Sequence, residues 1–248
     1  MNPTANSPVP DVSLPRKARS RLSAFRYSAV ELLGALVLLF LVAPFVDDLP
    51  QGKLIEAALV TLVMVFAVLA VGGQARTLAV ALLLVAPALV AKWANHLRPG
   101  LVPPEIFLAA SMLFFAFVIA HLLRFILRAS RVDANVLCAG ISGYLMLGLL
   151  WVPAYLLVAQ LSPAAFALTA GPDAGRSLDG FPAFYYSFMT LCTVGYGDII
   201  PISKVARMLA VLEAITGLFY MAVLISRLVA VYSSPQPPAG QPRPPSPM

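Results

Sequence analysis

Six long apolar runs constrain this chain more than any other feature of its sequence. A helix needs about 20 predominantly apolar residues to cross a bilayer. Candidate spans lie at 27–46, 54–72, 77–94, 105–123, 133–160 and 205–232. The third is the weakest, because Pro87 interrupts it, but Lys92 can reach the interface beside Trp93 and so allow the span. Only 11% of the residues are charged, against about 25% in soluble domains, so the sequence predicts an integral membrane protein.

Polar segments flank the six runs. Residues 1–26 are predicted to form a basic, disordered N-terminal tail, and residues 233–248, with seven prolines, a disordered C-terminal tail. A basic stretch before an apolar run is also typical of a secretory signal peptide. Here the run is long enough to span and no small-residue cleavage pattern stands out, so a retained signal anchor is expected.

The distribution of charge predicts the orientation. An even number of spans places both termini on one side, and the basic N-terminal segment assigns that side to the cytoplasm. The basic residues expected inside are Arg76, Arg124, Arg128, Arg131, Arg227 and Arg243, and the acidic residues expected outside are Asp47, Asp48, Asp173, Asp179 and Asp198. We therefore expect a multi-pass protein of the plasma membrane, the inner membrane of a bacterial cell. The basic residues are scattered between apolar runs, which is typical of orientation signals in a lipid bilayer, and binding to nucleic acid is not expected.

A shorter apolar segment lies between the last two spans. Residues 181–192 are too few to cross, and Pro182 suits the first turn of a helix, so a re-entrant helix is predicted. The following residues, 193–197, alternate two glycines with larger side chains, which permits a backbone whose carbonyls all turn one way. Unpaired carbonyls at membrane depth are tolerated only where they line an aqueous path or bind a cation. A ring of such carbonyls can replace the hydration shell of K⁺.

The run from residue 193 to residue 198, TVGYGD, resembles the selectivity filter of potassium channels. The resemblance implies that four backbone carbonyls and the first hydroxyl coordinate K⁺, with no other cofactor. It also implies a homotetramer, because the carbonyl cage needs four strands and one chain supplies one. The filter residues are Thr193, Val194, Gly195, Tyr196, Gly197 and Asp198, of which the first four coordinate K⁺.

The resemblance also divides the chain. Residues 133–232 are predicted to form a pore domain, with an outer helix at 133–160, a pore helix at 181–192, the filter at 193–198 and an inner helix at 205–232. Residues 27–132 supply four further helices, the layout of voltage-gated-type channels. The predicted fold is an all-α membrane protein of six transmembrane helices. Its re-entrant pore helix and selectivity-filter loop lie between helices 5 and 6.

Three residues before the filter are expected to support it. Tyr185 and Tyr186 precede it by one or two helical turns and can brace it with their hydroxyls, although ordinary aromatic packing explains either one equally well. Thr190 is grouped with them. In some related channels an acidic residue stands in place of Met189 and pairs with the external aspartate, so Asp198 must here pair with another group.

Two residues of the inner helix are candidates for a gate or hinge. Gly217 lies where pore-lining helices of this family often have a glycine hinge, and close helix packing explains it equally well. Glu213 is an ionisable residue inside a span, and such residues are functional candidates by default. It either faces the filter or cavity, or is a carboxyl group hydrogen-bonded within the bundle.

The sequence thus predicts a K⁺-selective channel that is weakly or not voltage-gated. The fourth span contains no Lys or Arg, and Arg124, Arg128 and Arg131 follow it, where the positive-inside rule explains them and a degenerate sensor is the alternative. The competing functions are a component of a K⁺ uptake transporter and a non-conducting regulatory subunit. An enzyme is not expected, because no nucleophile elbow, phosphate loop or zinc motif is found.

Overall fold

The structure is a computed structural model that describes residues 16–46, 49–71, 75–98, 100–129, 131–171 and 174–232, with backbone alone for 16–28. The predicted tail segments 1–15 and 233–248 lie outside the described residues. The same holds for four charges used to predict the orientation, which are Asp47, Asp48, Asp173 and Arg243.

Helices account for most of the part of the chain that the structure describes. In chain order the elements are α1 (Arg16–Val46), α2 (Gly52–Val71), α3 (Ala75–Leu97), α4 (Pro104–Arg128), α5 (Ala134–Leu161), β1 (Phe166–Leu168), α6 (Gly180–Leu191), β2 (Ile199–Pro201) and α7 (Lys204–Tyr232). Every helix except α6 is long and apolar enough to cross a membrane, so the prediction of an all-α membrane protein with six spans is confirmed. Helix α1 begins at Arg16, although its apolar window starts only at Ala29.

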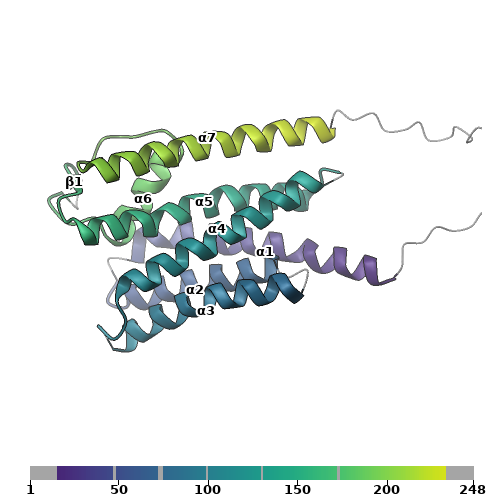
Figure 1. Cartoon of the computed structure of the whole chain (residues 1–248), viewed down its shortest axis with the longest axis horizontal. Coiled ribbons are helices and arrows are strands. Elements are labelled where there is room, and N and C mark those ends of the chain that lie inside the picture. The colour runs from purple at the N-terminus through teal and green to yellow at the C-terminus, as the bar shows by residue number, and fades with distance from the viewer. Residues whose placement is uncertain are drawn as a thin grey trace, which may run out of the picture.

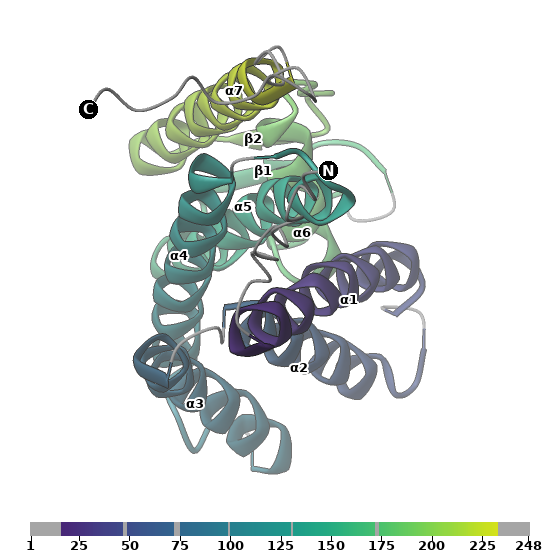
Figure 2. The ribbon, with the colours of Figure 1, turned by 90° about the vertical axis from the view of Figure 1, so that its right-hand side faces the viewer.

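The long helices run alongside one another (Figure 1). Helices α1, α2 and α3 lie together on one side, α7 lies on the opposite side, and α4 and α5 lie between them (Figures 1 and 2). Helix α1 begins and α7 ends at the same end of the bundle (Figure 1). The short helix α6 lies near the other end, packed against both α5 and α7.

Local contacts and one hydrogen bond from α7 define the ends of α4 and the start of α5. Proline at position 104 occupies the first turn of α4, where its missing N–H costs nothing. Asp133 caps α5, and its Oδ1 accepts a 3.0 Å hydrogen bond from the Val136 N–H. Arg227 near the end of α7 donates through Nη2 to the Ala129 carbonyl at 2.7 Å. The last part of α7 is therefore attached to the α4–α5 connection.

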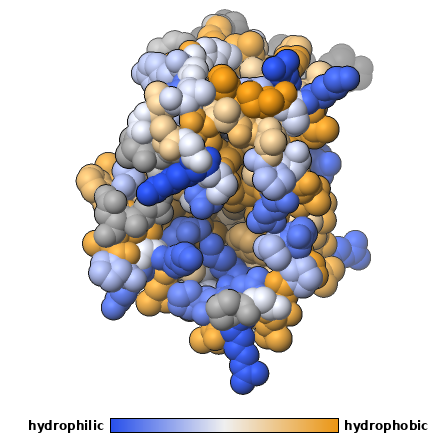
Figure 3. Space-filling model, turned by 90° about the vertical axis from the view of Figure 1, so that its left-hand side faces the viewer, coloured by the Kyte–Doolittle hydropathy of each residue, from blue (hydrophilic) through white to orange (hydrophobic). Residues whose placement is uncertain are grey.

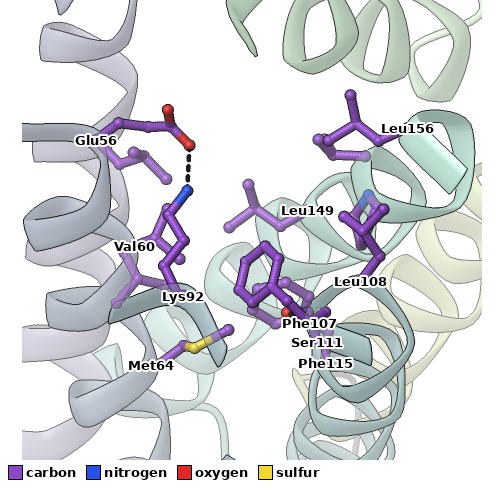
Figure 4. Close-up of a pocket in the computed structure, with 14 residues that line it drawn as sticks. Glu56, Val60, Met64, Lys92, Phe107, Leu108, Ser111, Phe115, Leu149 and Leu156 are labelled. Atoms are coloured by element: carbon purple, nitrogen blue, oxygen red, sulfur yellow. Dashed lines mark hydrogen bonds and ion pairs between the residues drawn. The ribbon is translucent and has the colours of Figure 1, made fainter. Parts of the chain in front are cut away.

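The third span is stabilised by a polar contact between helices. Lys92 of α3 turns toward Glu56 of α2, with 2.7 Å between Nζ and Oε1, and its ammonium lies 5.2 Å from the centre of the Phe107 ring (Figure 4). The neighbouring Trp93 donates from Nε1 to Thr61 Oγ1 at 3.1 Å. Lys92, which was predicted to reach the interface, thus forms an ion pair with Glu56 of a neighbouring helix. The pair borders a cavity of about 90 Å³ between these helices and α5.

A small sheet, which the sequence did not predict, joins the loops on either side of α6. Strands β1 and β2 are antiparallel, with Leu168 opposite Ile199, and beyond them the Ile202 N–H donates to the Ala165 carbonyl at 2.7 Å. Each strand has three residues, too few for an alternating hydropathy pattern to be recognised. The sheet attaches the loop after α5 to the chain that leaves residue 198.

Candidate functional site

Helix α6 directs the chain into the candidate site. It has 12 residues, about 18 Å at 1.5 Å per residue, which is too short to cross a hydrocarbon core of about 30 Å. Glycines on its neighbours allow α6 to lie close to them. A Cβ at Gly148 of α5 would lie 2.3 Å from the Phe188 ring, and one at Gly217 of α7 would lie 2.7 Å from the Leu191 carbonyl oxygen.

The loop that follows α6 takes its shape from backbone hydrogen bonds to the end of that helix. The N–H groups of Thr193 and Val194 donate to the carbonyls of Thr190 and Met189, both at 2.9 Å, and the Gly195 N–H donates to Met189 at 3.3 Å. Three residues of the loop have positive φ, with 56° at Thr193, 53° at Gly195 and 82° at Gly197. Donors are thus turned toward α6 at one side of the loop.

The carbonyls of the same loop are left free. Within the described part of the chain, no backbone or side-chain donor bonds to the carbonyl oxygens of residues 193–196. The loop is exposed along its length, with Val194 at 48% and Tyr196 at 73% of full exposure. Carbonyl groups without hydrogen bonds cost free energy at membrane depth unless a cation binds them and further protein surrounds the loop.

The outer end of the loop is held on two sides. On one side the Thr169 N–H donates to the Asp198 carbonyl at 2.7 Å, and Thr169 Oγ1 donates to the Gly197 carbonyl at 3.2 Å. On the other side the Tyr185 hydroxyl makes a side-chain hydrogen bond with the Asp198 carboxylate. With Met189 unable to pair with this carboxylate, Tyr185 takes that place.

The other predicted supports lie on the opposite face of α6. Tyr186 is buried, and its ring packs against Tyr155 of α5, with 4.8 Å between centroids, and against Phe166 of β1 at 5.6 Å. The Thr190 side chain makes hydrogen-bonding contacts with the hydroxyls of Tyr155 and Tyr186. The structure therefore places Tyr185 and Tyr186 on two sides of α6, one against Asp198 at the end of the loop and one against α5.

Glu213 and Gly217 lie on the face of α7 that meets α6. Glu213 is completely buried, accepts a hydrogen bond from the Tyr155 hydroxyl at Oε2, and has Oε1 2.6 Å from the Ser187 hydroxyl. The structure has the close approach at Gly217 that helix packing requires, whereas its role as a hinge stays a prediction. For Glu213 it favours the hydrogen-bonded group within the bundle.

Sequence reasoning missed three residues near the site. Tyr155, Ser187 and Thr169 each contact a predicted site residue. Tyr155 and Ser187 are polar residues within apolar segments, a signal that was available, since buried polar side chains are almost always hydrogen-bonded. Thr169 lies in a loop without any distinguishing pattern, and nothing in the sequence indicates its contact.

The three arginines that follow the fourth span lie away from the filter. Arg124 and Arg128 are exposed in the last two turns of α4, and Arg131 is exposed in the α4–α5 connection. This is the end of the bundle at which α1 begins (Figure 1). The opposite end, which carries β1, gathers hydrophilic side chains over much of its surface, with hydrophobic ones toward its edges (Figure 3).

Comparison with known proteins finds one matching family model and several proteins that are similar to part of the chain. Residues 154–234 match the model of a family described as ion channel. The chain is 42% identical over 53 residues to the inward rectifier potassium channel Kirbac3.1 of Paramagnetospirillum magnetotacticum, which is 21% of this chain and 18% of that protein. It is 40% identical over 48 residues to two-pore potassium channel 4 of Arabidopsis thaliana (19% and 17%), and 41% over 46 residues to the voltage-gated potassium channel Kch of Escherichia coli (18% and 11%).

These matches cover a limited region. The chain spans less than a fifth of the length of each of these three relatives, and the family model matches residues 154–234. No solved structure matches the chain significantly.

Proposed function

We propose that this chain conducts K⁺ passively through a pore lined by the carbonyls of residues 193–196, since residues 154–234 match an ion-channel family and the chain is similar to potassium channels. The observation that carries the proposal is the filter backbone. Its N–H groups bond back to α6 while its carbonyls are left free. Carbonyl oxygens in this arrangement can replace the water around a dehydrated K⁺ ion.

A homotetramer with a central pore completes the proposal. Helix α7 exposes apolar side chains around its circumference, among them Leu218 at 60% and Phe219 at 67%. The exposed Tyr196 also lacks a covering surface within the described part of the single chain. Lipid can cover one face of α7, and neighbouring copies around a four-fold axis would cover the others and bring four filter loops together.

In the proposed orientation the chain spans the plasma membrane, with both termini in the cytoplasm. The exposed Arg124 and Arg128 at one end and the polar surface at the filter end support this orientation (Figure 3). Helix α6 and the filter then form the re-entrant segment of a pore domain at residues 133–232, and residues 27–132 form the peripheral four-helix region.

The first test is ion flux through purified protein in liposomes. We expect efflux from liposomes loaded with K⁺ and little efflux from liposomes loaded with Na⁺. We also expect a native mass in detergent four times that of the monomer. Protein-free liposomes are the control. Flux without K⁺ preference, or a monomeric protein that still conducts selectively, would contradict the proposal. Absence of flux would favour the alternative of a non-conducting regulatory subunit, and flux coupled to a second ion would favour a component of a K⁺ uptake transporter.

We also expect the open probability to vary little with voltage. Moving one charge through the field is worth about 2.3 kcal/mol per 100 mV, and steep gating uses roughly 3–4 such charges in each subunit. Here the arginines of α4 begin only at Arg124, in its last two turns. Recordings in symmetrical K⁺ should show a dependence of less than about one charge per subunit. A steep, sigmoidal curve that Arg124→Gln or Arg128→Gln flattens would show that a sensor is present.

A further inference from the structure

A buried polar cluster joins three helices directly behind the filter. Its members are Glu213 of α7, Ser187 of α6 and Tyr155 of α5. Glu213 and Ser187 have no exposed surface, and neither has Tyr155. A carboxyl group buried among apolar helices is costly unless its oxygens are hydrogen-bonded, so Glu213 depends on the groups that α5 and α6 place around it.

Each polar atom of this cluster has a partner. Both carboxyl oxygens of Glu213 are engaged, Oε2 by the Tyr155 hydroxyl and Oε1 by Ser187. Ser187 Oγ also lies 2.9 Å from the Gly148 carbonyl oxygen, which can only accept. Because a serine hydroxyl has one proton, all three contacts are satisfied when the group at position 213 donates to Ser187. A neutral carboxylic acid can do this, and so can the amide of a glutamine.

The cluster is connected to the filter through α6. Tyr155 contacts the Thr190 side chain, and the Thr190 carbonyl accepts the Thr193 N–H at 2.9 Å. One turn beyond Glu213, the backbone of α7 at Gly217 lies against the Leu191 carbonyl. Helix α7 therefore meets the last two turns of α6 at two places, and at one of them Glu213 contributes a hydrogen bond.

We propose that Glu213 is a positioning residue of the pore, which fixes α6 relative to α5 and α7 so that the filter carbonyls keep their conducting arrangement. This inference rests on the proposed function. In it the filter exchanges between a conducting and a non-conducting state, and the cluster stabilises the first. Because the hydrogen bonds of the cluster are all satisfied by a neutral carboxyl group at position 213, Glu213 acts on the filter through these hydrogen bonds and not through a charge.

The test compares three substitutions at the same position. Glu213→Gln keeps a donor and an acceptor in the same shape, Glu213→Leu keeps the approximate size without hydrogen bonds, and Glu213→Asp is one methylene too short to reach both partners. Ser111→Ala is the matched control, because it removes another buried hydroxyl, which bonds only to Phe107 O of its own helix α4. K⁺ flux from liposomes and single-channel recordings in planar bilayers are the measurements.

We expect Glu213→Leu and Glu213→Asp to reduce the fraction of time spent conducting by about tenfold, the effect of losing one or two hydrogen bonds of a buried group. The unitary conductance should stay unchanged, and Glu213→Gln and Ser111→Ala should behave like the wild type. The inference is overturned if Glu213→Leu conducts like the wild type, if Glu213→Gln fails as Glu213→Leu does, or if the unitary conductance changes with the charge.

Two further variants keep the inference testable if Glu213→Leu does not fold. Tyr155→Phe and Ser187→Ala each remove one hydroxyl of the cluster, and both should lower the conducting fraction several-fold without changing the unitary conductance. Wild-type recordings from both would overturn the inference. A wild-type protein that carries no K⁺ flux, by contrast, would contradict the proposed function itself, so the two failures are distinguishable.

Discussion

Gly195→Ala is expected to abolish K⁺-selective flux. The φ angle of Gly195 is +53°, in the left-handed region where a Cβ costs about 1–2 kcal/mol per residue. In a tetramer this strain recurs four times around one ring. Within the chain nothing lies within 4 Å of the added Cβ, so the effect arises from the backbone: the residue is driven toward negative φ, and its carbonyl leaves the ring. Paired K⁺ and Na⁺ flux measurements in liposomes should show a loss of discrimination.

Gly100→Ala provides the matched control. Gly100 also has positive φ, at +86°, and also has open space around its Cβ position, but it lies in the connection between α3 and α4. It imposes a similar backbone strain away from the filter, and selective flux should persist. Wild-type discrimination in Gly195→Ala, or an equal loss in Gly100→Ala, would show that the filter geometry does not set K⁺ preference.

Gly217→Ala should destabilise the protein and reduce K⁺ flux at least tenfold. Its Cβ would lie 2.7 Å from the Leu191 carbonyl oxygen and 2.8 Å from Leu191 Cδ1. The backbone oxygen cannot move aside without shifting the end of α6, which leads directly into the filter. Inserting a group into such a tight contact costs about 1–3 kcal/mol. Thermal unfolding in detergent and liposome flux should both report the change.

Gly34→Ala in α1 is the control for that substitution. Nothing lies within 4 Å of the Cβ it would add, and alanine favours a helix over glycine by about 1 kcal/mol. Its stability should therefore equal or exceed that of the wild type, with unchanged flux. A Gly217→Ala protein that melts and conducts like the wild type would indicate that α6 and α7 are not in close contact in the membrane.

The six spans were predictable from the sequence because hydropathy over about 20 residues is a property of each segment alone. The weakest candidate, 77–94, forms a helix whose Lys92 is paired with Glu56, 36 positions earlier. Such a partner is set by how α2 and α3 pack, and hydropathy carries no information about it. The pairing of Leu168 with Ile199 was likewise beyond reach, because strands of three residues leave no pattern.

The filter loop was recognisable because its residues and their order are specific, whereas the contacts around it depend on packing. From sequence, Glu213 had two open interpretations, and only the positions of Ser187 and Tyr155 on neighbouring helices distinguish them. Tyr185 and Tyr186 are adjacent in sequence, yet they serve opposite faces of α6. Which face each residue takes follows from the direction in which α6 enters the bundle.

The short connection between Arg128 and Ala134 has a consequence for biogenesis. Helix α4 packs along α5 of its own chain, and α1 also contacts α5, so the peripheral helices are laid against the pore helices before any second copy is required. Each subunit can thus mature in the bilayer as a complete wedge. In the tetramer proposed above, assembly would then join finished subunits through α7 and the filter loop.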